Sequence, residues 1–277
     1  MKVAVTGACG FVGRHVLTEL AQAQVQIVAT TRSATQHECP AMTNVRWVTL
    51  DIGWPPERCF EVLGEPDVLI HLAWAWLPNY RSLHHFETEL PLHYRFLAGL
   101  VREGLPSLVC VGTSFEYGLQ YGPLAAGIET RPTNPYGFAK DTLRKQLQHL
   151  KMLHSFNLTW ARLFYMHGEG QPETSLFAML KKAVAAGQPV FKMSGGEQLR
   201  DYLPVIEVAR RLVDLAVAPH DLGPVNICSG TPISVRRLVE GWIKEYGWKI
   251  ELQLGELPYP DYEPMAFWGD DARGEHG

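Results

Sequence analysis

The chain begins with a short apolar strand that runs into three glycines spaced three residues apart, in the run TGACGFVG at positions 6–13. An amphipathic segment follows this run. A turn this tight needs residues without a Cβ, so that backbone amides can approach a phosphate at the start of a helix. Strand, glycine turn and helix together predict a dinucleotide-binding fold, which constrains the order of the elements that follow.

Short apolar runs alternate with longer amphipathic runs over the first two-thirds of the chain. The apolar runs predict strands at Lys2–Thr6, Gln26–Thr31, Val45–Leu50, Asp67–Leu72, Ser107–Gly112 and Leu158–Leu163. The amphipathic runs predict helices at Phe11–Ala23, about His84–Glu103 and about Pro135–His154. This alternation predicts an α/β fold of the Rossmann type, a doubly wound parallel sheet covered by helices on both faces.

The alternation breaks after about residue 165. Two helical segments, about Glu173–Gly187 and Val205–Ala218, are mixed there with short strands and many glycines and prolines. We expect a dinucleotide-binding domain at residues 1–165 and a smaller C-terminal α/β substrate-binding lobe at 166–270, with the chain crossing between the two. The polar residues 271–277 are expected to form a loose tail.

Composition and charge argue against several classes of protein. With 277 residues, 46% of them hydrophobic, the chain can bury a large core. The net charge of -4 and the pI of about 6.3 argue against nucleic acid as a partner, since a phosphate backbone attracts a basic face. No apolar run reaches the roughly 20 residues that span a bilayer, and no leader precedes the first strand. We therefore expect a cytoplasmic protein without a membrane partner.

The five cysteines are odd in number and contain no Cys-x-x-Cys pair. Cytosolic thiols are normally reduced, so we expect buried, free cysteines rather than a disulfide framework. The histidines and cysteines also lack the spacing of metal ligands, and no metal site is expected.

The end of the second strand indicates which nicotinamide cofactor the protein binds. Sites specific for NAD usually carry an acidic residue there, which binds the ribose hydroxyls. Thr31, Arg32 and Ser33 follow instead, and their guanidinium and hydroxyl groups suit a 2′-phosphate. We predict a preference for NADP(H), with NAD(H) as the alternative and a solvated Arg32 as the plain interpretation. Asp51, just after the third strand, is either an acceptor for the adenine amino group or an ordinary turn residue.

Tyr136 and Lys140 lie four residues apart on a predicted helix, hence on one face. A phenol, with a pKa near 10, is a poor acid-base group at neutral pH unless a neighbouring ammonium lowers that pKa. We expect Lys140 to do this and also to bind the nicotinamide ribose. Thr113 or Ser114, at the end of the fifth strand, supplies a hydroxyl toward the reacting oxygen; the alternative is a hydroxyl that only caps the strand.

With these residues the chain resembles the extended short-chain dehydrogenase/reductases that act on nucleotide sugars, the NAD-dependent epimerase/dehydratase group. The resemblance covers nearly the whole chain, including the glycine turn, PYGFAK at 135–140 and RDY at 200–202. It implies hydride transfer at a sugar carbon, with Tyr136 moving the proton and Lys140 tuning the tyrosine. It also implies that the hydroxyl four residues before Tyr117 is catalytic, which selects Thr113. By the same resemblance Arg200 reaches the substrate diphosphate; a salt bridge to Asp201 or a neighbour is the alternative.

Departures from the family narrow the reaction. Ser114 and Phe115 stand where the 4,6-dehydratases carry an Asp and a Glu, so dehydration is disfavoured. Tyr165 stands where many UDP-sugar epimerases carry an asparagine, and Glu89 also replaces an asparagine. The runs GTSFEYG at 112–118 and EPMAFW at 263–268 resemble members that handle 6-deoxy-4-keto sugars on dTDP.

The resulting hypothesis is an NADP(H)-dependent reductase that acts on the 4-keto group of a nucleotide-linked 6-deoxyhexose. Two alternatives remain, a nucleotide-sugar epimerase with tightly bound NAD and a non-catalytic NADP(H)-binding sensor or scaffold. The resemblance further implies a homodimer, because the helices around 84–103 and 135–154 often pair across a two-fold axis in the family.

The candidate site residues fall into two further groups besides the catalytic three, Thr113, Tyr136 and Lys140. The candidates for cofactor binding are Gly7, Gly10, Phe11, Val12, Gly13, Thr31, Arg32, Ser33, Asp51, Ile52, Leu72, Ala73, Trp74, Tyr136 and Lys140. The candidates for substrate binding are Ser114, Phe115, Tyr165, His167 and Arg200.

Overall fold

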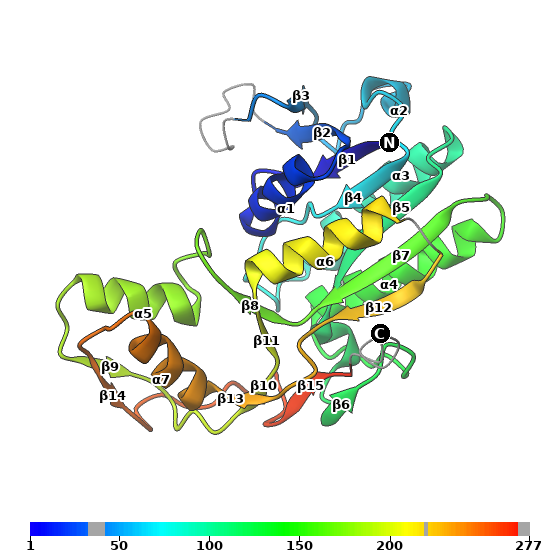
Figure 1. Ribbon diagram of the computed structural model, residues 1–277. Coiled ribbons are helices and arrows are strands. Elements are labelled where there is room, and N and C mark those ends of the chain that lie inside the picture. The colour runs from blue at the N-terminus through cyan, green and yellow to red at the C-terminus, as the bar shows by residue number, and fades with distance from the viewer. Residues whose placement is uncertain (33–41, 219–220, 271–277) are drawn as a thin grey trace.

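The computed structural model describes residues 1–32, 42–218 and 221–270, and its centre is one large parallel sheet (Figure 1). The sheet has seven strands in the order β12-β7-β5-β4-β1-β2-β3. These strands are β1 (Lys2–Thr6), β2 (Gln26–Thr31), β3 (Val45–Thr49), β4 (Val68–His71), β5 (Ser107–Thr113), β7 (Asn157–Leu163) and β12 (Gly223–Ile227). The chain moves outward from β1 in both directions, so the point where the strand order reverses lies between β1 and β4. The predicted doubly wound fold is confirmed.

Helices cover both faces of this sheet, because alternate residues of each strand point to opposite sides. Val3 and Val5 of β1 belong to a core shared with α1 (Phe11–Gln22) and α6 (Val205–Val217). Ala4, between them, belongs to the opposite core with α3 (Leu90–Arg102) and α4 (Pro135–Lys151) (Figure 1). A short helix, α2 (Cys59–Val62), packs on the second side. The strands buried on both faces explain the nearly continuous apolar runs in the sequence.

The predicted strands agree with the structure to within one residue at each end, and β12 is the one strand of the large sheet that the sequence analysis missed. It lies beyond α6, in the region assigned to the smaller lobe, and begins with Gly223 and Pro224. It pairs with β7 at the edge of the sheet, where a proline is tolerated. The segment from α6 to β12 therefore returns to the large sheet. The helix expected at 84–103 consists of a π-helical turn (His85–Glu89) followed by α3.

The remaining elements form small sheets beside the carboxyl end of the large one. The parallel pair β8 (Tyr165–His167) and β11 (Tyr202–Pro204) lies just past β7. The other pairs are β6 (Gly122–Leu124) with β15 (Phe267–Gly269), β9 (Val190–Lys192) with β14 (Glu251–Gln253), and β10 (Leu199–Arg200) with β13 (Ile233–Ser234). α5 (Leu176–Ala185) and α7 (Val235–Glu245) share a separate apolar core around β9. Figure 1 shows these elements at the left.

The cysteines correct one expectation. Cys59, Cys110 and Cys228 are free and buried, as expected. Cys9 is instead disulfide-bonded and only partly buried, because it lies in the turn after β1 rather than within a strand. Cys39 lies outside the described residues. Within the described ranges, no helix is long and apolar enough to cross a membrane, and no group of three His, Cys, Asp or Glu side chains is arranged to hold a metal ion.

Candidate active site

A cavity of about 780 Å³ opens at the carboxyl ends of β1, β4, β5 and β7. This is where an open α/β sheet binds its ligands, next to the point where the strand order reverses. It brings together segments more than one hundred residues apart in the chain. The predicted site residues that line it are Gly7, Gly10, Phe11, Val12, Gly13, Leu72, Trp74, Thr113, Ser114, Phe115, Tyr136, Lys140 and Tyr165.

The glycine turn has the shape of a phosphate cradle. Gly7 has a φ of +70°, and a Cβ there would lie 2.7 Å from the backbone nitrogen of Ala73. A Cβ on Gly13 would lie 2.2 Å from the carbonyl oxygen of Gly7. Gly10 is the N-cap of α1, which has neither a capping side chain nor an acidic residue in its first turn. The free N–H groups of that turn therefore face the cavity and fit the pyrophosphate of a dinucleotide.

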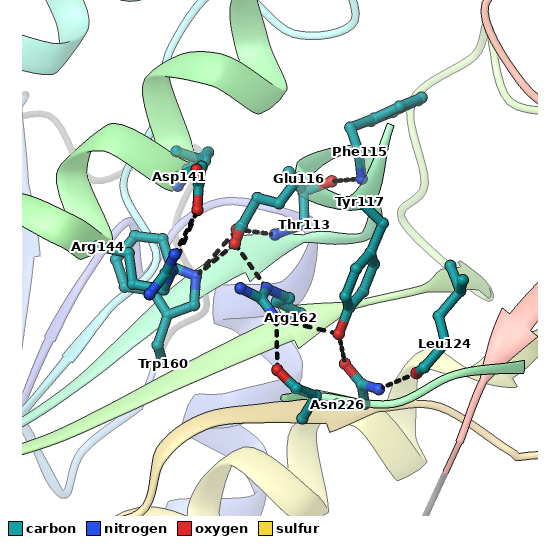
Figure 2. Close-up of polar contacts among 12 residues, drawn as sticks. Thr113, Phe115, Glu116, Tyr117, Leu124, Asp141, Arg144, Trp160, Arg162 and Asn226 are labelled. Carbon is teal, nitrogen blue, oxygen red and sulfur yellow. Dashed lines mark hydrogen bonds and ion pairs between the residues drawn. The ribbon is translucent and has the colours of Figure 1, made fainter. Parts of the chain in front are cut away.

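A buried carboxylate fixes the backbone at Thr113, the last residue of β5. Glu116 lies in the 3-10 turn (Ser114–Tyr117) that follows, and its Oε1 accepts a hydrogen bond from the Thr113 backbone N–H at 2.9 Å. The same carboxylate accepts from Trp160 Nε1 at 2.9 Å and from Arg162 Nε at 2.6 Å, as Figure 2 shows. Burial raises the pKa of Glu116, and the Arg162 guanidinium opposes that rise. Because donors contact both oxygens, the Glu116 carboxylate is kept in one orientation, and its hydrogen bond fixes the backbone of Thr113.

Tyr136 stands in the first turn of α4, where the chain enters the cavity wall. Asn134 caps this helix, its Oδ1 accepting from the Gly137 N–H at 2.9 Å, and Pro135 fills the first helical position. The Thr113 side chain lowers the pKa of Tyr136, but burial, the largest effect, raises that pKa by more. Lys140 was expected to lower the pKa of Tyr136, but that pKa is raised. The tyrosine is therefore a neutral phenol.

Lys140 lies one helical turn further along α4 and is almost fully buried. Its Nζ donates to the carbonyl oxygen of Val111 at 2.9 Å and lies 4.0 Å from the centre of the Trp74 ring. Burial lowers the pKa of Lys140 to about 8. The charges of Glu116 and Glu89 oppose this lowering, and the ammonium stays protonated at neutral pH.

Trp74 is fixed in turn by a group of histidines beneath it. Its ring stacks on that of His93 at 4.4 Å and 14°, and its Nε1 donates to His85 Nδ1 at 3.1 Å. His93 is hydrogen-bonded to Glu89 at 3.1 Å and to His71 at 2.8 Å. Burial raises the pKa of Glu89, but hydrogen bonds from His93, the Ala75 N–H and His84 outweigh it and lower the pKa to about 2. Burial lowers the pKa of His71 and of His93, so both rings are neutral. His93 contacts the Glu89 carboxylate directly, and His71 contacts His93.

Two of the substrate-binding candidates do not line the cavity. Arg200 is buried, and its Nε and Nη2 donate to Glu263 Oε2 at 3.2 and 2.9 Å. Arg200 therefore forms a salt bridge, but with Glu263 and not with Asp201, whose carboxylate accepts from backbone N–H groups. His167, on β8, faces a second cavity of about 610 Å³, together with Phe177 and Trp248.

Several cofactor candidates also lie outside the cavity wall. Asp51 Oδ1 accepts from the Gly53 N–H at 2.8 Å, as an ordinary turn residue does, and Ile52 packs against the core beneath α3. Thr31 and Arg32 follow one another at the end of β2, with Arg32 exposed. Ala73 lies against Gly7, as given above, and Ser33 lies outside the described residues.

The structure adds cavity residues that the sequence did not indicate. Tyr80 and Arg81 belong to the loop after β4, and Tyr262 belongs to the segment before β15. The centre of the Tyr80 ring lies 4.8 Å from that of Phe115, 5.6 Å from that of Tyr136 and 6.4 Å from that of Tyr262. No motif connects these residues, since they meet only through the fold. Among the described residues, no aspartate or glutamate lines the cavity.

A model of the NAD dependent epimerase/dehydratase family matches residues 3–228, which include the glycine turn, Thr113, Tyr136 and Lys140. The chain belongs to this family. Two relatives of the family are dTDP-6-deoxy-L-talose 4-dehydrogenases. The NAD(+) enzyme of Aggregatibacter actinomycetemcomitans is 30% identical over 97% of this chain and 99% of its own length. The NAD(P)(+) enzyme of Kitasatospora kifunensis is 27% identical over 94% of this chain and 83% of its own.

A solved structure supports the fold of this epimerase/dehydratase family member. The UDP-N-acetylglucosamine 4-epimerase from Methanobrevibacter ruminantium M1, in complex with UDP-N-acetylmuramic acid, superposes with a TM-score of 0.86 at 20% identity. The match covers 99% of this chain and 90% of that one. At this identity the likeness concerns the fold alone. Family membership itself makes the chain a nucleotide-sugar oxidoreductase or epimerase that uses a nicotinamide cofactor.

Proposed function

We propose that this protein reduces the 4-keto group of a dTDP-linked 6-deoxyhexose, with NADPH as the reductant. The observation that carries the proposal is the cavity itself, which brings Tyr136, a neutral phenol, together with Thr113, Lys140 and the glycine turn. A neutral phenol is the form that donates a proton, which reduction of a ketone requires.

The chemistry follows from three side chains. When bound, the nicotinamide supplies a hydride to the sugar carbon. Tyr136 then gives its proton to the carbonyl oxygen, and the Thr113 hydroxyl donates a hydrogen bond to that oxygen as negative charge develops on it. Lys140, charged below its pKa of about 8, stabilises the phenolate that Tyr136 becomes. The buried contacts of Glu116 and Trp74 keep these groups in place between turnovers.

The cavity wall supports a deoxysugar substrate. The rings of Tyr80 and Phe115 lie next to Tyr136, and the Tyr262 ring contacts both of them. Their ring faces suit a sugar methyl group better than a hydroxymethyl group. The lack of a carboxylate on the described wall disfavours dehydration, which needs an acid-base group besides the tyrosine. Both curated relatives named above act on a dTDP-linked 6-deoxyhexose at C4, in agreement with this choice.

NADP(H) remains the favoured cofactor. Thr30 and Thr31 end β2 and the exposed Arg32 follows, with no carboxylate among them; a guanidinium there suits a 2′-phosphate. NAD(H) is the alternative, since one of the relatives uses NAD(+) and the other both cofactors. The homodimer also stays a prediction. Phe138 on α4, 49% exposed beside Phe86, offers an apolar contact for a second copy.

The test is NADPH oxidation in the presence of a dTDP-4-keto-6-deoxyhexose, with the sugar product resolved afterwards. We expect loss of NADPH absorbance and a product with a hydroxyl at C4. Interconversion of nucleotide sugars without NADPH loss would instead identify an epimerase. If neither reaction occurs over a panel of dTDP, UDP, GDP and CDP sugars, the proposal is wrong.

A further inference from the structure

A nucleotide sugar brings a diphosphate into the cavity, and that diphosphate needs a cation. Arg200, which the sequence suggested for this role, is occupied. Its guanidinium is bound to Glu263 and to the carbonyl oxygens of Leu199 and Met265, and it is 3% exposed. Glu263 is in addition hydrogen-bonded to the Tyr165 hydroxyl. Freeing Arg200 for a ligand would leave a buried carboxylate without its counter-charge, which is strongly unfavourable.

The cavity wall offers another cation. Among the described residues, the lining contains two positive side chains, Lys140 and Arg81. Lys140 is nearly fully buried beside Tyr136, at the reacting end of the cavity. The side chain of Arg81 is 65% exposed, at the opening formed by the loop after β4 and the segment before β15. Its guanidinium lies 5.7 Å from the centre of the Tyr262 ring and is ion-paired with Asp261.

We propose that Arg81 binds the diphosphate of the nucleotide sugar, an inference that rests on the proposed function. A guanidinium is planar, always charged and able to form two parallel hydrogen bonds to phosphate oxygens. Its carboxylate partner Asp261 is 79% exposed and therefore well screened, so the ion pair between them is weak and exchangeable. The Tyr262 ring supports the guanidinium from one side while the pair with Asp261 opens.

This arrangement makes a prediction that a merely structural role does not share. If Arg81 binds the diphosphate, Asp261 competes with the ligand for the same guanidinium and also repels its negative charge. Removing the charge of Asp261 must then strengthen diphosphate binding, whereas removing Arg81 must weaken it. If Arg81 and Asp261 only join two loops of the cavity wall, both changes loosen the same contact and shift binding in the same direction.

The experiment is calorimetric titration of the purified full chain with dTDP, and with thymidine as the probe that lacks phosphate, at one ionic strength. The variants are Arg81→Ala and Asp261→Asn. Arg131→Ala is the matched control, because Arg131 has a similar exposure of 69%, is paired with Glu129 and does not line the cavity. We expect Arg81→Ala to weaken dTDP binding by about tenfold or more, the loss of one charge-assisted contact. Asp261→Asn should strengthen it severalfold, and Arg131→Ala should leave it unchanged.

The inference would be overturned by any of the following results. Equal affinity of the wild type and Arg81→Ala for dTDP would exclude a contact with the diphosphate. Shifts in the same direction for Arg81→Ala and Asp261→Asn, or an equal loss of thymidine affinity, would indicate a structural role. NADPH binding by each variant verifies that the fold is intact. If the wild type binds UDP or GDP but not dTDP, the proposed nucleotide is wrong and the same variants test Arg81 with the nucleotide that binds; if it binds none, both proposals fail.

Discussion

The two walls of the cavity are held by different means. Behind the wall formed by β5 and α4, Glu116 of the 3-10 turn and Arg162 of β7 are 0% and 1% exposed and form an ion pair with further buried donors around it. At the wall formed by the loop after β4 and the segment before β15, the lining residue Arg81 pairs with Asp261, and the two side chains are 65% and 79% exposed. The first pair cannot be opened without leaving a buried charge, whereas the second exchanges with solvent at little cost.

The difference separates chemistry from recognition. Proton transfer needs Thr113 and Tyr136 within a fraction of an ångström of their working positions, which buried groups on a continuous sheet provide. Recognition of a diphosphate needs a charge that can move onto the ligand, which an exposed loop provides. A substitution in the first wall should therefore change turnover, and a substitution in the second should change nucleotide binding.

The wall formed by β5 and α4 carries the reacting groups and is called the chemical wall below. The largest effect is expected there, from Tyr136→Phe. The variant keeps the ring in its packed position but has no proton to give, so turnover should fall by about 10³-fold or more. NADPH and dTDP binding should stay within a factor of two or so, because recognition lies elsewhere. Steady-state kinetics and calorimetry on one preparation measure both.

Tyr262→Phe is the matched control for that experiment, as it removes a hydroxyl from the opposite wall. It should leave kcat nearly unchanged. Substantial turnover by Tyr136→Phe, or an equal loss of kcat in Tyr262→Phe, would contradict the separation of the two walls.

The two walls also differ in how far the sequence predicts them. Glycine turns, strand alternation and the Tyr-x-x-x-Lys pair are local patterns, so the large sheet and Gly7, Tyr136 and Lys140 followed from them. Arg81 and Asp261 lie 180 residues apart and meet only in the folded chain. Arg200 belongs to the RDY motif, but its partner Glu263 is 63 residues away, and no spacing in the sequence indicates that the two form a pair. β12 was missed because it begins with Gly223 and Pro224, which leave only a short apolar run to indicate a strand.

Glu116→Gln tests the support of the chemical wall. It leaves the Arg162 guanidinium buried without a counter-charge, so the free energy of unfolding should fall by about 3 kcal/mol. The glutamine amide has one acceptor oxygen for the three donors of Thr113, Trp160 and Arg162, so the backbone at Thr113 is less well fixed, and kcat should fall with dTDP affinity unchanged. Urea unfolding and kinetics give the two values.

Glu129→Gln, which breaks the exposed pair with Arg131, serves as the comparison and should change stability by less than about 1 kcal/mol. Equal losses in the two variants would show that burial of the Glu116 pair has no special role.

Lys140→Met tests whether the buried charge of Lys140 lowers the free energy of unfolding. Burial lowers the pKa of Lys140 to about 8 from the value of 10.5, so folding at pH 7 must bury a charge. Methionine removes that cost, and the variant should gain about 2 kcal/mol of unfolding free energy at pH 7 while losing activity. Above pH 8 the folded wild type has released this proton and the unfolded chain has not, so wild-type stability rises with pH and the gain shrinks.

Urea unfolding of both proteins at pH 7 and pH 9.5 measures this trend. Lys145→Met changes a lysine on the same helix whose side chain is 54% exposed, and it should bring no comparable gain. A gain that does not change with pH would exclude the Lys140 charge as its cause.

The smallest effect is expected at the edge of the sheet, from Arg32→Ala. Arg32 is exposed at the end of β2, away from both walls, so its removal should leave kcat and stability unchanged. Its guanidinium is predicted to bind the 2′-phosphate, a single exposed contact, so NADPH affinity should fall by about tenfold while NADH affinity stays the same. Arg58→Ala, at a side chain 76% exposed and paired with Glu61, should change neither affinity. Fluorescence titration with both cofactors separates the outcomes. Equal losses for NADPH and NADH would place Arg32 near a group common to both, and no loss for either would leave it a solvated arginine and remove the main support for NADP(H).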